Sequence, residues 1–117
     1  MNSIFILLAL LQIKHWYIDF VDQTAEEVRC KGIYGHWTGI AHSFKHAVVT
    51  WVLVLLFAPV PLACALALLD LAIHYHTDWI KIRFGNRDIT SPTFWNHLGL
   101  DQMIHQFTYI AIAFVIS

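Results

Sequence analysis

Four long apolar stretches, each with its charged residues gathered toward one end, constrain the fold of this 117-residue chain more than any other feature. They cover about residues 3–23, 40–58, 62–83 and 99–117. Each is close to the roughly 20 residues that an α-helix needs to cross the hydrocarbon core of a membrane. A helix of a soluble bundle would carry polar residues along one whole face, whereas "VVTWVLVLLFA" and "YIAIAFVI" are apolar all round. The pattern predicts an all-α membrane protein: one integral membrane domain over residues 1–117, with four transmembrane helices in an up-down-up-down bundle.

The composition agrees with this prediction. Hydrophobic residues make up 58% of the chain and charged residues 13%, against roughly 45–50% and 25% in soluble proteins. The formal net charge is −1 at pH 7, so the chain lacks the excess of basic residues that is typical of nucleic-acid-binding domains. We therefore expect a lipid bilayer around the chain and no nucleic-acid partner.

Lysine and arginine gather in or beside the first and third connections between the predicted helices. These residues are Arg29, Lys31 and Lys45 at the first connection, and Lys81, Arg83 and Arg87 at the third. Basic residues concentrate in the cytoplasmic loops of membrane proteins. The chain is therefore predicted to be a multi-pass protein of the inner (cytoplasmic) membrane, with both termini outside.

Each predicted helix carries one pair of polar residues spaced four positions apart. This spacing places both side chains on one helix face, and the alternating helix directions bring all four pairs to one level, toward the cytoplasm. The pairs are His15 and Asp19, His42 and His46, His74 and Asp78, and Asp101 and His105. Charged side chains at bilayer depth cost several kcal/mol unless they are paired or bind something.

Five imidazoles and three carboxylates at one level indicate a metal site. Both groups are common ligands of first-row metals, and helical bundles build metal sites from inward-facing side chains. We expect these eight residues to bind divalent metal ions, up to two of them, with zinc, manganese and iron as candidates. The alternative is a network of hydrogen bonds between the helices without any metal.

Several further polar residues lie near the pairs. Gln23 and Gln102 could orient a ligand or substrate, and Asp70, one turn before His74, could join the network. Lys81 could pair with Asp78, hold an anionic group such as a phosphate, or simply extend to the membrane surface. One of the three aspartates could act as a general base instead of a ligand. The candidate catalytic residues are Asp19, Asp78, Asp101 and Lys81; His36 and His97 are expected in loops.

The order of these short motifs resembles that of the DUF3307 family of small bacterial and phage membrane proteins. The matching segments are "HWYIDFVDQ", a lysine in the following loop, "HSFKHAVV", "HYHTDWIK" and "LDQMIH", which together touch all four predicted helices. The arrangement is more loosely similar to the YdjM-type membrane-bound metal-dependent hydrolases. These resemblances imply a small multi-span membrane protein, often phage-encoded, with metal-dependent hydrolysis as the activity of the second group.

The leading functional hypothesis is a metal-dependent hydrolase at the cytoplasmic membrane face, acting on a lipid or phosphate-containing substrate. A bound divalent ion would activate water and polarise a phosphoryl or acyl oxygen. A non-enzymatic membrane interaction protein of phage or bacterium, with a structural His/Asp network, is the main alternative. A membrane di-iron oxidoreductase is a minor one, because only His42 and His46 form an HxxxH pair.

Overall fold

The structure, a computed structural model, describes residues 2–117, and no strand occurs among them. The helices are α1 (Ser3–Trp16), its π-helical continuation η1 (Tyr17–Val21), α2 (Ala25–Cys30), α3 (Trp37–Leu55), α4 (Val60–Phe84) and α5 (Pro92–Ile116). The prediction of an all-α protein is confirmed.

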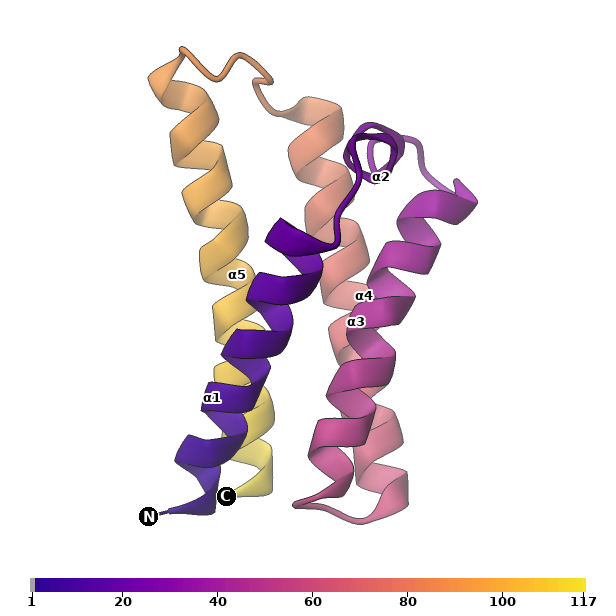
Figure 1. The fold of residues 1–117 in the computed structure, drawn as a ribbon, viewed down its shortest axis with the longest axis vertical. Coiled ribbons are helices and arrows are strands. Elements are labelled where there is room, and N and C mark those ends of the chain that lie inside the picture. The colour runs from indigo at the N-terminus through magenta and orange to yellow at the C-terminus, as the bar shows by residue number, and fades with distance from the viewer. Residues whose placement is uncertain (1) are drawn as a thin grey trace.

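The four long helices run alternately in opposite directions, as Figure 1 shows. Both termini and the short turn between α3 and α4 lie at one end of the bundle, while α2 and the α4–α5 connection lie at the other (Figure 1). Helix α1 packs against α3 and α5, and α4 packs against the same two helices. Helices α1 and α4 are therefore diagonal neighbours, and their inner faces meet at the centre of the bundle.

Two helical segments, Ser3–Val21 and Val60–Phe84, are long and apolar enough to cross a membrane by length and composition. Helices α3 and α5 do not meet that criterion, because the first half of each is polar: "WTGIAHSFKH" in α3 and "PTFWNHLGLDQ" in α5. The prediction of four transmembrane helices thus extends beyond what the structure supports, and it stays a prediction.

Helix α5 begins earlier than the apolar pattern predicts. It starts at Pro92 rather than near residue 99, because Ser91 caps it by accepting a hydrogen bond from the backbone N–H of Thr93, and proline is favoured in the first turn of a helix. His97, expected in a loop, therefore lies in α5 and is partly buried.

The short helix α2 was not predicted. Thr24 caps it, and Thr24 Oγ1 accepts a hydrogen bond of 3.1 Å from the backbone N–H of Glu27. The sequence "TAEE" matches the T-x-x-E pattern of a capping box, which is the signal that apolar density misses. Helix α2 covers the end of the bundle beside α3 (Figure 1).

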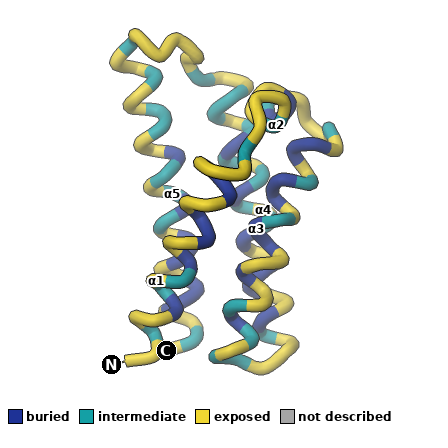
Figure 2. Tube along the Cα trace, in the orientation of Figure 1, coloured by how far each residue is buried: buried dark blue, intermediate teal, exposed yellow. Residues whose placement is uncertain are grey.

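Buried residues face the interior of the bundle along its length (Figure 2) and form three successive layers. The layer nearest the termini is apolar and includes Leu7, Leu11, Val54, Ala63, Leu66 and Ile112. Next along the helices come Lys14, Thr50, Asp70 and Tyr109, all buried. The third layer holds the histidines and aspartates of the predicted pairs.

Candidate metal centre

The structure brings all eight residues of the predicted pairs together inside the bundle. None is more than 6% exposed, and contacts of 3.7 Å or less between imidazole nitrogens and carboxylate oxygens link them into one connected network. The prediction that the four pairs share one level is confirmed. Within this network, two groups have donor atoms close enough to hold a metal ion.

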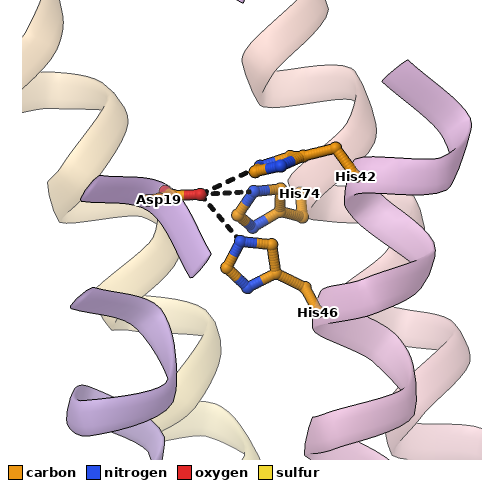
Figure 3. A group of neighbouring side chains, drawn as sticks. All are labelled: Asp19, His42, His46 and His74. Atoms are coloured by element: carbon orange, nitrogen blue, oxygen red, sulfur yellow. Dashed lines mark hydrogen bonds and ion pairs between the residues drawn. The ribbon is translucent and has the colours of Figure 1, made fainter. Parts of the chain in front are cut away.

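The first group consists of Asp19 from η1, His42 and His46 from α3, and His74 from α4 (Figure 3). The Nε2 atoms of the three histidines lie 2.9, 2.7 and 3.6 Å from the same oxygen, Asp19 Oδ1. π-Helical turns such as η1 occur frequently at functional sites. Three imidazole nitrogens and one carboxylate oxygen are a donor set that zinc commonly takes.

A carboxylate outside the first group orients His42. Glu27 Oε2 lies 3.1 Å from His42 Nδ1, and Lys45 Nζ lies 3.1 Å from Glu27 Oε1. An ionised carboxylate only accepts hydrogen bonds, so Nδ1 of His42 carries a proton. With its proton on Nδ1, His42 could bind a metal ion at Nε2 in place of the 2.9 Å contact that Nε2 makes with Asp19 Oδ1. Metal-binding histidines are usually oriented by such a carboxylate.

His74 has unsatisfied hydrogen-bonding capacity. It is fully buried, and among residues 2–117 neither of its ring nitrogens has a hydrogen-bond partner. Its ring is stacked between those of His46 and His105, with centroid distances of 3.8 and 4.0 Å. A buried polar atom without a partner is costly. A metal ion bound at Nε2 would satisfy that nitrogen.

The buried charges are balanced at every aspartate of the centre except one. The lysine nitrogens of Lys14, Lys31 and Lys81 lie 3.3, 3.0 and 3.0 Å from carboxylate oxygens of Asp70, Asp78 and Asp101, respectively. Within the described chain, no lysine or arginine nitrogen lies within 4 Å of the Asp19 carboxylate. The only basic side chains within that distance are imidazoles. A positive charge is therefore lacking at the carboxylate on which three Nε2 atoms converge.

The second group, His74, Asp78 and His105, shares His74 with the first. Asp78 Oδ2 lies 3.2 Å from His74 Nε2, and Asp78 Oδ1 lies 3.3 Å from His105 Nε2. Asp101 Oδ1 lies a further 3.3 Å from His105 Nε2. The two groups are thus continuous, and they extend from η1 and α3 through α4 to α5.

The predicted flanking residues also reach the centre. Gln102 accepts a 2.6 Å hydrogen bond from His15 Nε2 and donates one of 3.0 Å to Asp101. Gln23 donates to the backbone oxygen of Asp19 and accepts from Lys31. Lys81 pairs with Asp101, so the suggested pairing of Lys81 with Asp78 is wrong: Lys31 has that position.

A second buried ion pair lies next to the histidines and was missed in the sequence. Lys14 Nζ is 3.3 Å from Asp70 Oδ2 and 2.9 Å from His46 Nδ1. Thr50 donates a 2.6 Å hydrogen bond to the same oxygen of Asp70. A lysine inside a predicted span, one residue before His15, was the available signal for this pair, and Asp70 joins the network as its spacing from His74 suggested.

A groove between α4 and α5 reaches the edge of the centre. It has a volume of about 300 Å³ and is lined largely by apolar side chains, including Ile80, Phe84, Leu100 and Ile104. Lys81 and Asp101 also line it. Asp101 Oδ1 is buried and accepts no hydrogen bond from the described residues, and it lies 3.3 Å from His105 Nε2.

Replacing Lys14 by methionine is expected to lower the free energy of unfolding by about 3–5 kcal/mol, because it leaves Asp70 buried without its counter-charge. The double variant Lys14→Met/Asp70→Asn is expected to recover much of that loss. Lys45→Met removes a half-exposed pair and should cost about 1 kcal/mol or less. Denaturant titration of the purified protein in detergent measures all three. Equal losses for Lys14→Met and Lys45→Met would contradict this account.

Comparisons of the chain with protein-family models, with curated proteins and with solved structures find no match. The resemblance to the DUF3307 family stays a prediction.

Proposed function

We propose that this chain is an integral membrane protein that binds a divalent metal ion through Asp19, His42, His46 and His74, and that it is a metal-dependent hydrolase. One observation carries the proposal: three imidazole Nε2 atoms meet one carboxylate oxygen that no lysine or arginine neutralises. A divalent cation would supply the missing charge and would replace the hydrogen bonds that Nε2 of His42 and His46 make with Asp19 Oδ1. Zinc fits this donor set best, and manganese and iron also bind imidazole and carboxylate.

The exposed surface supports a membrane location. Large hydrophobic side chains are exposed on all four long helices, among them Phe5, Trp51, Leu68, Phe107 and Phe114. Apolar surface this extensive is unusual on a monomeric soluble protein. With two helices long enough to cross a membrane, it favours an inner-membrane protein. The basic residues of the connections favour a centre placed toward the cytoplasm.

A bound divalent ion would make water a nucleophile at neutral pH and polarise a phosphoryl or acyl oxygen. The residues beside the first group suit the remaining roles in hydrolysis. Asp101, which lines the groove and contacts His105, is our candidate for the general base, and Lys81 beside it could hold an anionic oxygen. The apolar groove between α4 and α5 ends at these two residues, which favours a lipid or another amphiphile with a phosphate or ester group.

The burial of the first group favours one second candidate. All four donors are at most 6% exposed, and the α4–α5 groove touches none of them. A closed set of four protein ligands is typical of structural zinc sites. In that case the protein would be a non-enzymatic membrane interaction protein whose ion holds the bundle together.

Metal content tests the binding half of the proposal. Because His74 belongs to both groups, His74→Ala is expected to reduce the zinc, manganese or iron bound by the detergent-purified protein to background. His76→Ala, two residues away on an exposed face of the same helix, should retain the metal. Inductively coupled plasma mass spectrometry gives the ions per chain. A wild-type protein that stays metal-free after incubation with each ion would refute the site.

Hydrolysis is tested on the metal-loaded protein. We expect release of phosphate or fatty acid from phosphatidate or phosphoglycerolipid vesicles. Asp101→Asn should lower the rate by about 10²–10⁴-fold and leave the metal content unchanged. Asp88→Asn, in the exposed α4–α5 connection, is the matched control. A metal-loaded wild-type protein that releases neither product would favour the non-enzymatic candidate.

The contact between Glu27 and His42 makes a separate prediction. Glu27→Gln retains the size of the side chain but loses the charge that fixes the proton on His42 Nδ1. Metal affinity is expected to fall by about 10–100-fold, measured by competition with a chromogenic chelator. Glu26→Gln, at the exposed neighbouring position of α2, should not change it. Equal affinities for the two variants would rule out this role for Glu27.

A further inference from the structure

The two metal-binding groups compete for one atom. His74 Nε2 lies 3.6 Å from Asp19 Oδ1 and 3.2 Å from Asp78 Oδ2. The nitrogen of a neutral imidazole offers a single lone pair, so His74 Nε2 can bind an ion in only one of the two groups. If it binds in the first group, the second retains two of its own ligands, Asp78 and His105, and would need Asp101 as a third.

A cation of the protein already occupies the second group. Lys31 lies at the end of α2 and is only 4% exposed. Its Nζ is 3.0 Å from Asp78 Oδ2, the same oxygen that approaches His74 Nε2 and, at 3.7 Å, His42 Nε2. Gln23 accepts a hydrogen bond from this ammonium group. Lys31 thus lies where a second ion bound to Asp78 would have to be.

We propose that the centre holds a single metal ion, bound by Asp19, His42, His46 and His74, and that the Lys31 ammonium group takes the position of a second cation beside Asp78. This inference rests on the proposed metal binding and specifies its stoichiometry. The distribution of lysines supports it, because Asp70, Asp78 and Asp101 each have a lysine partner and Asp19 has none. Among the buried aspartates of residues 2–117, this leaves only Asp19, which three histidines surround, for an ion.

Lys31 also determines whether the second group can bind an ion. A second divalent ion at Asp78 would face the Lys31 ammonium group across one carboxylate, and the like charges would repel each other. Removing the ammonium group leaves Asp78, His105 and Asp101 without that repulsion. Those three side chains supply enough donors for a second ion, with water completing its coordination. The identity of residue 31 therefore sets the number of ions.

The test is the number of ions per chain after equilibrium dialysis of the full-length protein against Mn²⁺. We expect about one ion for the wild type and for the charge-conserving variant Lys31→Arg, and about two for Lys31→Met. Lys81→Met is the matched control, because it removes a lysine from Asp101 and should stay at about one. Electron paramagnetic resonance gives an independent readout: isolated Mn²⁺ in the wild type and a spin-coupled pair in Lys31→Met.

Two ions in the wild type, or a single ion in folded Lys31→Met, would overturn the inference. His105→Gln keeps it testable if Lys31→Met does not fold, because this variant should retain the one ion of the wild type; loss of that ion would place it in the second group and refute the assignment. A wild type that binds no ion refutes the proposed metal binding itself. Zero ions in the wild type therefore refutes metal binding, whereas two ions refutes only the single-ion centre.

Discussion

A carboxylate that is removed from water must meet a cation or several hydrogen-bond donors, since the cost of burying it uncompensated is large. Four aspartates lie in the interior of this small bundle, and their compensation determines much of the remaining structure. Lysines from α1, α4 and the end of α2 meet three of them. Imidazoles from α3 and α4 meet the fourth. The helices are therefore tied across the bundle by charge as well as by apolar packing.

Over much of its length the bundle has polar side chains inside and apolar side chains outside, which is the reverse of a soluble protein. Apolar packing is confined to the layer near the termini and the α3–α4 turn, while large apolar side chains cover the outside. In water such a surface would favour aggregation, whereas in lipid the apolar exterior is at no disadvantage and the interior polar contacts hold the helices together. The same arrangement that suits a metal ion thus also suits a bilayer.

The candidate site was easier to predict from the sequence than the full network around it. Spacing of four residues and alternating helix directions were enough to bring His15, Asp19, His74 and Asp78 to one level with the other pairs. Nothing local in the sequence relates Lys14 to Asp70 or Lys31 to Asp78, because those contacts join residues 56 and 47 positions apart, across the bundle. The start of α5 and the existence of α2 depended on capping residues, which a search for apolar density does not detect.

The short helix α2 lies outside the four-helix core, yet it supplies two of the charges that act on the centre. Glu27 contacts His42 and Lys31 contacts Asp78, and the backbone hydrogen bond from Lys31 to Glu27 places them one helical turn apart. Connections between helices usually tolerate insertions. Here one inserted residue between these two would rotate one side chain by about 100° relative to the other, so that only one of them could still reach its partner. The length of this connection is thus fixed by the chemistry inside the bundle, although it runs along the outside.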